Sequence, residues 1–235
     1  MAGDTKNGSM KITYYGHSCF ELEVNDQRIL IDPFITPNEK AASIDISKLN
    51  PDFILLSHGH ADHVADVEAI GKNSGAMIVS NYEIVQWFAG KGLENGHGMN
   101  IGGNWTFPFG KVKMVNAIHS SSMPDGSYGG NPAGFILEAE NKFFYYAGDT
   151  ALHMDMKQIR EDVSLELAFL PIGDNFTMGI KDAVRAAEYA GARKVIGMHY
   201  DTFPPIEIDK DEAQRAFDAA GIELILMSVG ETINI

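Results

Sequence analysis

The segment from His58 to His63, with the sequence His-Gly-His-Ala-Asp-His, carries four side chains that can bind a metal ion. Imidazole and carboxylate groups are the ligands that Zn²⁺ and similar borderline metals prefer. A surface-exposed, tag-like histidine tract is the alternative interpretation. The apolar run 53–56 that precedes the segment is typical of a buried strand, which argues against such a tract. The segment is therefore predicted to be a metal site.

The neighbouring elements place these ligands in a tight strand-to-helix turn. The strand precedes the segment, and residues 64–70 are predicted to form the first turns of a helix. His58 and His60 are two residues apart at an extended strand end, so they can point to the same side. Asp62 and His63 are adjacent and can turn towards a second metal. The turn supplies half of two coordination spheres, and the other ligands must come from downstream.

Three later strands also end at residues that can bind a metal. These strands and the residues that follow them are 112–117 with His119, 142–147 with Asp149, and 194–198 with His199. Loops at strand ends along one sheet edge are where functional sites collect. Asp149 alone also fits its Ala-Gly-Asp-Thr turn without any function. The four strand ends together indicate one shared metal centre.

Short apolar or alternating runs predict strands along the chain, first as hairpins and later in alternation with helices. The predicted strands are 11–15, 19–24, 28–31, 53–56, 76–79, 112–117, 135–139, 142–147, 167–172, 194–198 and 224–227. The predicted helices are 64–70, 81–89, 181–189 and 209–220. Residues 120–133 are rich in Ser, Gly and Pro and are expected to form a loop at the edge of the site. This pattern favours two sheets packed together with helices outside.

The composition disfavours several classes of partner. A net charge of −14, from 18 basic and 32 acidic residues, disfavours nucleic acid, whose backbone needs clustered Lys and Arg. No apolar run approaches the ~20 residues that a membrane-spanning helix needs. The expected partner is a small-molecule substrate, and the oligomeric state stays open.

Length and cysteine content predict one domain in a reducing compartment. The chain of 235 residues suits a single domain. Residues 1–9 are polar and lack the apolar core of a signal peptide, so we expect a cloning remnant followed by a domain over residues 10–235. The single cysteine, Cys19, excludes an internal disulfide, is expected to be a buried core thiol and fits a cytoplasmic location.

The order of these motifs is similar to that of the metallo-β-lactamase superfamily. The resemblance rests on His-Gly-His-Ala-Asp-His, an isolated His, the Gly-Asp of Tyr-Tyr-Ala-Gly-Asp-Thr and a His after Gly-Met, and it spans nearly the whole chain from Met10. It implies an α+β fold, a four-layer αβ/βα sandwich of two mixed sheets with the metals at one edge. Residues 12–23, 29–34 and 171–179 further resemble the compact, cytosolic metal-dependent hydrolase group near the ascorbate-6-phosphate lactonase-like branch.

The resemblance also implies a set of metal ligands. The first metal would be held by His58, His60 and His119. The second would be held by Asp62, His63 and His199, and Asp149 would bridge the two metals. The related flavodiiron oxidoreductases typically have Glu at the position of His60 and carry a flavodoxin domain, for which this chain has no room. His60 therefore favours two divalent ions in a hydrolytic site, with Zn²⁺ preferred and Mn²⁺ or Fe²⁺ as alternatives.

Such a centre implies hydrolysis. Two divalent ions about 3.5–4 Å apart lower the pKa of a bridging water towards neutrality. The resulting hydroxide is expected to attack an ester, lactone or phosphoester of a small substrate, with Asp62 orienting it as well as binding metal. A phosphodiesterase or nuclease of the same fold is one alternative, which the acidic composition disfavours. A catalytically silent metal-binding protein is the other, which the complete set of ligand positions disfavours.

Other polar residues near the predicted site have two interpretations. His17, in Gly-His-Ser, is either a catalytic acid or substrate contact or a structural, hydrogen-bonding histidine. Asp32 either orients a ligand histidine or only forms its turn. Asn175 and Thr177, on another strand-end loop, are candidates for contact with substrate or metal-bound water, and Tyr128 for covering a substrate. The histidines expected to bind no metal are His97 and His153.

Overall fold

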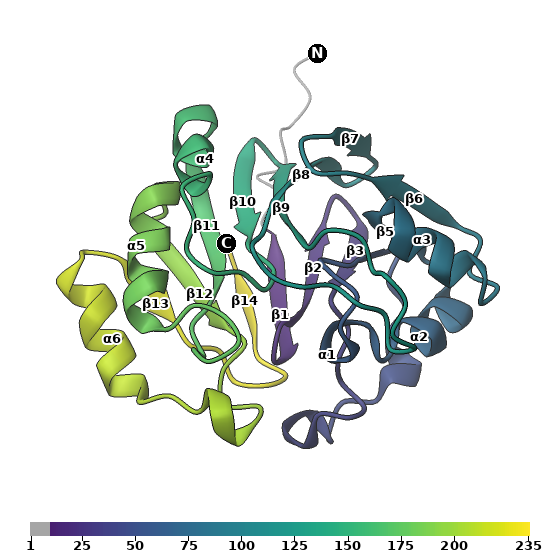
Figure 1. Ribbon diagram of the computed structural model, residues 1–235, viewed down its shortest axis with the longest axis horizontal. Helices are drawn as coiled ribbons and strands as arrows, with labels where there is room; N and C mark the ends of the chain where they lie inside the picture. The colour runs from purple at the N-terminus through teal and green to yellow at the C-terminus, as the bar shows by residue number, and fades with distance from the viewer. Residues whose placement is uncertain (1–9) are drawn as a thin grey trace, which may run out of the picture.

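Two mixed β-sheets face each other in the computed structural model, which describes residues 10–235, and helices cover the outer face of each sheet (Figure 1). The strands run from β1 to β14 and the helices from α1 to α6 in chain order. Residues 1–9, expected to be a cloning remnant, lie outside the described residues. The architecture is the predicted α+β sandwich of two sheets between outer helices.

The first sheet has seven strands in the order β14-β1-β2-β3-β4-β5-β6. Its strands are β14 (Thr232–Asn234), β1 (Lys11–Gly16), β2 (Cys19–Val24), β3 (Gln27–Ile31), β4 (Phe53–Leu55), β5 (Met77–Asn81) and β6 (Gly96–Met99). Pairing is antiparallel from β14 to β3 and parallel from β3 to β6.

The second sheet repeats this pattern in the order β7-β8-β9-β10-β11-β12-β13. Its strands are β7 (Asn104–Phe107), β8 (Gly110–Asn116), β9 (Ala133–Ala139), β10 (Lys142–Tyr146), β11 (Leu165–Pro171), β12 (Lys194–Met198) and β13 (Glu223–Ile225). Pairing is antiparallel from β7 to β10 and parallel from β10 to β13. The two sheets therefore share one strand order, with β14 and β7 in equivalent places.

Two-residue turns with positive φ close the hairpin between β2 and β3 in the first sheet and the hairpin between β9 and β10 in the second. Asn25 and Asp26, between β2 and β3, have φ angles of 52° and 59°. Glu140 and Asn141, between β9 and β10, have φ angles of 52° and 60°. Positive φ at both central residues is typical of the type I′ turn, whose twist matches that of the flanking strands.

Helices pack on the outer faces of the sheets. Those on the side of the first sheet are α1 (Ala61–Val64), α2 (Val67–Ser74) and α3 (Tyr82–Ala89), and those on the second are α4 (Met156–Asp162), α5 (Ile180–Ala190) and α6 (Lys210–Ala219). The short 3₁₀ helices are η1 (Glu39–Ala41), η2 (Ile46–Lys48) and η3 (Pro204–Ile206). None of the helices in residues 10–235 combines the length and hydropathy needed to cross a bilayer.

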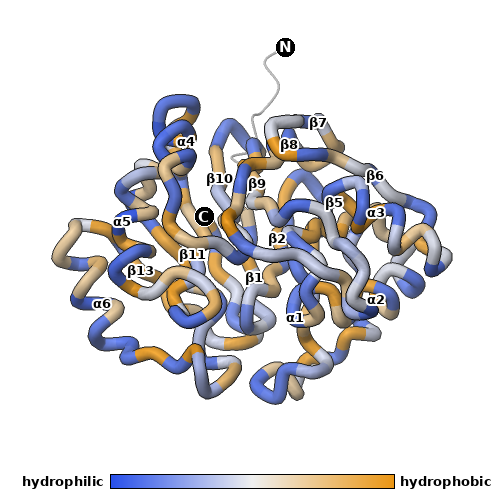
Figure 2. Tube along the Cα trace, viewed as in Figure 1, coloured by the Kyte–Doolittle hydropathy of each residue, from blue (hydrophilic) through white to orange (hydrophobic). Residues whose placement is uncertain are grey.

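The main hydrophobic core fills the space between the two sheets. Phe20 of β2, Phe135 of β9 and Phe169 of β11 are buried there, and the ring centroids of Phe20 and Phe169 are 4.9 Å apart. A second cluster packs the first sheet against its helices and contains Phe88 and Cys19, which is a buried free thiol as predicted. Hydrophilic residues predominate on the exposed turns of α4 (Figure 2).

Some elements differ from the prediction. The helix predicted over 64–70 is two helices, α1 and α2, because the backbone of Asp66 leaves helical geometry between them. Its carboxylate accepts backbone hydrogen bonds from Ile35 (2.6 Å) and Thr36 (2.9 Å), which fix this break. The edge strands β6, β7 and β14 and the helix α4 have no counterpart among the predicted elements, because their short sequences lack a clear apolar period.

Candidate metal centre

Loops at one edge of the two sheets bring the predicted ligands together. The strands β8, β10 and β12 run in the same direction in the second sheet, so the loops that follow them meet at one edge. These loops carry His119, Asp149 and His199. The loop after β4 of the first sheet adds the segment from His58 to His63. Both sheets therefore contribute to one centre.

Three histidines form one half of the centre, and they are the residues predicted to hold the first metal. His58, His60 and His119 each offer one nitrogen, and these atoms lie within 4.8 Å of one another. The Nε2 atom of His58 is 3.0 Å from Nδ1 of His60. The second nitrogen of His60, Nε2, is 3.3 Å from the hydroxyl of Ser120, which helps to fix the ring.

The other half contains the three residues predicted for the second metal and one more. Ligand atoms of His17, Asp62, His63 and His199 lie within 4.8 Å of one another. The Oδ2 atom of Asp62 is 3.8 Å from His199 Nε2 and 4.0 Å from His63 Nε2. It is only 3.1 Å from Nε2 of His17, whose Nδ1 is 2.8 Å from the Thr202 hydroxyl. His17 thus contacts the centre from its buried side.

Asp149 lies between the two halves. Its Oδ2 atom is 3.6 Å from His119 Nε2 and 3.9 Å from His58 Nε2, in the first half. The same oxygen is 3.0 Å from His199 Nε2 and 3.2 Å from His63 Nε2, in the second half. One carboxylate oxygen therefore faces four imidazoles, which is the position that a bridging ligand requires.

Asp32 holds His63 from the side opposite the centre. Its Oδ2 atom is 2.8 Å from Nδ1 of His63, and both side chains have no exposed surface. The backbone N–H of Ser57 and the hydroxyl of Tyr146 also donate to this carboxylate, each at 2.8 Å. Because an ionised carboxylate only accepts, His63 carries its proton on Nδ1 and turns Nε2 towards the centre. This geometry fits the orienting role predicted for Asp32.

The loop over residues 120–133 is fastened to the ligand segment. The Ser121 hydroxyl accepts from the N–H of Gly59 at 3.1 Å and donates to the carbonyl of Gly129 at 2.9 Å. A Cβ atom at Gly59 would lie 2.6 Å from Met123 Sδ, so the loop packs against the position where the glycine has no side chain. The predicted loop is therefore part of the support of the centre.

Burial and neighbouring charges set the protonation of the centre. Burial lowers the pKa of His58 well below its usual range. Burial and the nearby His199 lower the pKa of His17 to about 4. Burial alone would raise the pKa of Asp149, but His199 and His63 beside it hold that pKa well below its usual range. Neutral imidazole and ionised carboxylate are the forms in which these groups bind metals.

Three buried atoms of the predicted ligands have no hydrogen-bond partner within residues 10–235: His63 Nε2, His199 Nδ1 and Asp149 Oδ1. Two of them, His63 Nε2 and Asp149 Oδ1, are atoms that a metal could satisfy. Burial alone would lower the pKa of His63, but Asp149 and Asp32 outweigh it and raise the pKa well above its usual range. The surroundings of His63 therefore favour a positive charge. The donor set fits divalent cations.

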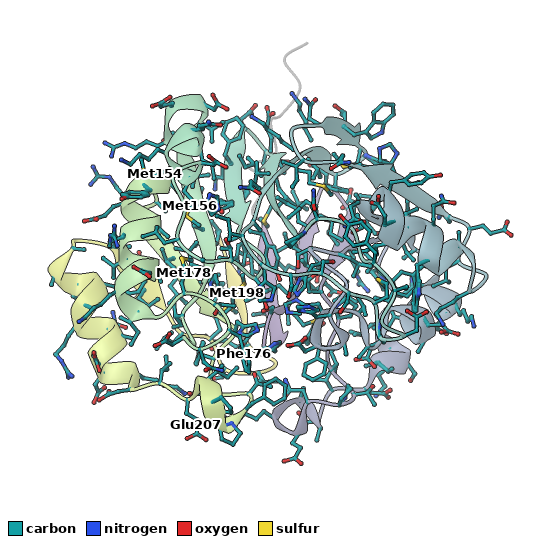
Figure 3. All side chains as sticks on the ribbon, viewed as in Figure 1. Met154, Met156, Phe176, Met178, Met198 and Glu207 are labelled. Carbon is teal, nitrogen blue, oxygen red and sulfur yellow. The ribbon has the colours of Figure 1, made fainter. Side chains whose placement is uncertain are left out.

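Two candidate substrate contacts lie on the loop after β11. The N–H of Met178 donates to the carbonyl of Thr150 at 3.1 Å, which places this loop next to Asp149. Asn175 is exposed, and the hydroxyl of Thr177 is buried without a partner in the described residues. Figure 3 marks Met178 on this loop together with Phe176, whose side chain is 55% exposed.

Three further residues of the sequence analysis lie outside both halves of the centre. His97 and His153 belong to none of the metal-capable groups found in residues 10–235. Tyr128 is exposed, and its hydroxyl donates to Asn131 at 3.1 Å.

Four polar residues of the centre carry too little signal to be found in the sequence. They hydrogen-bond to predicted ligands, to His17 or to Asp32, and they are Ser57, Ser120, Tyr146 and Thr202. Ser57 and Ser120 have a positional signal, because Ser57 directly precedes the His58 segment and Ser120 directly follows His119. The others are common residue types at positions with no distinctive spacing.

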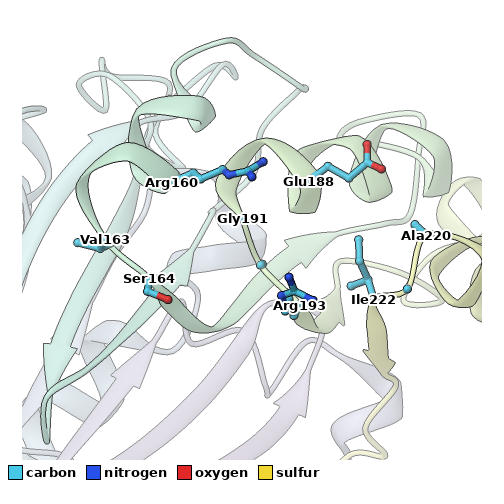
Figure 4. Close-up of a pocket in the computed structure, with 10 residues that line it drawn as sticks. Arg160, Val163, Ser164, Glu188, Gly191, Arg193, Ala220 and Ile222 are labelled. Atoms are coloured by element: carbon cyan, nitrogen blue, oxygen red, sulfur yellow. The ribbon is translucent and has the colours of Figure 1, made fainter.

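A separate cavity of about 560 Å³ lies at the C-terminal ends of α4 and α5 (Figure 4). Arg160, Glu188 and Arg193 are among the residues that line it. Arg193 precedes β12, whereas His199 follows that strand, so the cavity and the metal centre are at opposite ends of β12. The cavity is therefore not part of the candidate centre.

The fold and the site together define a class, the metallo-β-lactamase fold with a metal centre at the edge of two sheets. Residues 11–199 match the family model of the beta-lactamase superfamily domain. Igni18, a novel metallo hydrolase from the archaeon Ignicoccus hospitalis, is 35% identical with a TM-score of 0.87, covering 97% of this chain and 98% of that one. An isothiocyanate hydrolase from Delia radicum gut bacteria, 18% identical with a TM-score of 0.76 over 95% of this chain and 98% of its own, shares the fold alone.

Curated relatives narrow this class. UPF0173 metal-dependent hydrolases from Flavobacterium johnsoniae and Christiangramia forsetii are 54% and 55% identical to the chain, covering 96% of it and 100% of each relative. The chain therefore belongs to the UPF0173 family of metal-dependent hydrolases within the beta-lactamase superfamily. The predicted superfamily and sandwich fold are confirmed.

Proposed function

We propose that the protein uses two divalent ions, Zn²⁺ first among them, to hydrolyse an ester, lactone or phosphoester of a small substrate. The observation that carries this proposal is the place of Asp149, whose Oδ2 atom lies 3.6 Å from His119 and 3.0 Å from His199. One carboxylate between two ligand groups suits a pair of ions better than a single ion. Mn²⁺ and Fe²⁺ are the alternative metals.

The predicted ligands differ in the solvent exposure of their side chains. Divalent ions held by these side chains would supply Lewis acidity and lower the pKa of a water molecule. The side chain of Asp62 is 29% exposed, whereas those of His63, His199 and Asp149 are almost fully buried. Among the ligands of the second metal and the bridging Asp149, Asp62 is therefore the one that an incoming water can reach, and it is proposed to orient that water. Asp32 keeps His63 turned towards the centre.

Two alternative functions follow from the same fold. A phosphodiesterase or nuclease would need a basic surface for its substrate backbone, and the net charge of −14 disfavours it. A catalytically silent metal-binding protein would not need the exposed carboxylate of Asp62. The small-molecule partner and the cytoplasmic location stay predictions.

The proposal is tested by elemental analysis of the natively purified protein, with turnover measured in the same preparation on lactones, phosphodiesters and thioesters. About two ions per chain and turnover of one substrate class are expected. One ion or none after reconstitution, without turnover, would favour the silent metal-binding protein.

A matched pair of variants separates ligand loss from general damage. His60→Ala is expected to lower the metal content and abolish hydrolysis, because Nδ1 of His60 lies 3.0 Å from His58 Nε2 in the first half of the centre. His97→Ala removes an imidazole from β6, outside the centre, and is expected to keep the wild-type metal content and hydrolysis. Full metal content in His60→Ala would remove this residue from the ligand set.

A further inference from the structure

His17 lies in the turn between β1 and β2, where the two sheets meet at the metal centre. Its side chain has no exposed surface, and its backbone φ is +56°. A ring without exposed surface has no face for a substrate. Any part that His17 plays in the reaction therefore passes through the residues that it touches.

Three contacts connect His17 to the second half of the centre. Its Nε2 atom is 3.1 Å from Oδ2 of Asp62, which follows β4 of the first sheet. Its backbone carbonyl accepts the N–H of His199 at 2.9 Å, at the end of β12 in the second sheet. Its Nδ1 atom is 2.8 Å from the hydroxyl of Thr202, three residues after His199. One residue thus joins ligands that come from opposite sheets.

The protonation of this chain of contacts follows from the acceptor at its end. A carboxylate oxygen only accepts, so His17 donates the proton on Nε2 to Asp62. In a neutral ring, Nδ1 is then an acceptor and receives the hydrogen bond of the Thr202 hydroxyl. The Thr202 hydroxyl also lies 3.4 Å from the carbonyl of Tyr200, but Nδ1 of His17 at 2.8 Å is the nearer acceptor. A hydroxyl that donates to Nδ1 favours the ring form of His17 that can hold Asp62.

Aromatic packing fixes the direction of the His17 ring. Its centroid is 4.1 Å from that of His199, and the edges of Phe34 and Phe203 approach with centroids at 5.4 Å and 5.5 Å. The ring is thus held on several sides, while Asp62 stands on the four-residue helix α1 with a side chain that is 29% exposed. A fixed donor beside this partly exposed carboxylate limits the directions in which the carboxylate can point.

We propose that His17 and Thr202 are positioning residues that hold Asp62 and His199 in place and thereby set the affinity and geometry of the second metal site. This inference rests on the proposed two-metal function. It assigns Thr202 a part in the centre and gives His17 a role without substrate contact. The groups that hold a metal ligand in orientation typically affect metal affinity by about 10–100-fold.

Two substitutions at His17 separate its two side-chain contacts. Asn is well tolerated at positive φ and its amide occupies the place of Nδ1, so His17→Asn keeps the backbone but loses the donor to Asp62. The longer amide of His17→Gln reaches the place of Nε2 and restores that donor. Thr202→Val removes the hydroxyl, and Thr202→Ser returns it. His97→Asn is the matched histidine control outside the centre.

The experiment is a Co²⁺ titration of the metal-free full chain and each variant, followed by visible absorption. His17→Asn is expected to weaken one of the two binding steps by about 10–100-fold and to change the bands of that ion, while the other step stays as in the wild type. His17→Gln recovers most of this loss, and Thr202→Val shows a smaller loss that Thr202→Ser recovers.

The outcomes distinguish this inference from the proposed function. Two wild-type-like steps and an unchanged spectrum in His17→Asn would overturn the positioning role while leaving the two-metal function intact. An equal loss in His17→Asn and His17→Gln would also overturn it, because the donor to Asp62 would then not matter. A wild-type chain that binds a single Co²⁺ ion would overturn the proposed function and this inference with it.

Discussion

The hydroxyl of Tyr146 in the second sheet donates a hydrogen bond to the carboxylate of Asp32, which directly follows β3 of the first sheet, at 2.8 Å and with both side chains fully buried. The same carboxylate oxygen receives Nδ1–H of His63. The orientation of one ligand histidine therefore depends on a contact between the two sheets. Metal affinity in this centre should respond to residues that never touch the metal.

Asp32→Asn tests this dependence. Asp32 has a φ of +46°, which Asn also tolerates, so the backbone should persist while the acceptor for His63 is weakened. We expect about 10–100-fold weaker binding of the ion held by His63. Competition with a chromophoric chelator measures the loss. Asp52→Asn is the matched control, because Asp52 is exposed and lies away from the centre; equal affinities in the two variants would contradict the orienting role.

Gly59→Ala tests the support that the 120–133 loop gives to the ligand segment. The added Cβ would meet Met123 Sδ at 2.6 Å and the Ser122 carbonyl oxygen at 3.0 Å, so the loop must move. We expect a loss of about 1–3 kcal/mol in the free energy of unfolding, measured by urea denaturation, together with weaker metal binding. Adding Met123→Ala should recover part of this loss. No recovery would place the strain elsewhere than at Met123.

Removal of the metal should destabilise the whole protein. A ligand present at 100 times its dissociation constant stabilises the native state by about 2.7 kcal/mol. In a chain of this size we therefore expect treatment with a chelator to lower Tm by about 5–10 °C, and stoichiometric Zn²⁺ to restore it. Differential scanning calorimetry measures both changes. An unchanged Tm after verified metal loss would show that the centre is held by the protein alone.

Glu21 should make stability depend on pH. Burial raises the pKa of this β2 carboxyl, and its Oε2 atom has no hydrogen-bond partner in the described residues. The folded protein therefore binds the proton more tightly than the unfolded chain, so stability is lost as pH rises through the folded-state pKa. Glu21→Gln removes this loss.

The comparison of Glu21→Gln with wild type is made by thermal unfolding at two pH values. We expect a Tm about 2–4 °C higher than wild type at pH 8, the change that about 1 kcal/mol produces, and no difference near pH 4. Glu166→Gln is the control, because Glu166 is exposed on β11 in the other sheet. A difference that persists at pH 4 would point to packing instead of charge.

The candidate metal ligands could be proposed from the sequence because imidazole and carboxylate side chains mark them by residue type. His58, His119 and Asp149 each follow an apolar strand-like run after one intervening residue, so local pattern and ligand type coincide in the sequence. The alternation of strands and helices likewise predicts two sheets with helices outside.

An orienting role for Asp32 was one of its two interpretations, but the residues that hold His17 and Asp32 in place could not be predicted. His17 and Thr202 are 185 residues apart, and Asp32 and Tyr146 are 114 apart. Thr and Tyr occur throughout strands and loops, so nothing local marks these two. The strand β6 was missed for a related reason, since Gly96 and Gly98 give no apolar period and the strand exists through backbone pairing to β5.

The pairing of β14 with β1 brings the two ends of the described chain side by side. The N–H of Met10 donates to the carbonyl of Ile235 at 3.1 Å, and the N–H of Ile235 donates back at 2.9 Å. The fold therefore does not require the break in the chain to lie between Met10 and Ile235. A circular permutant that joins these two residues by a short linker and opens the exposed turn at Lys91 and Gly92 would keep every ligand loop continuous.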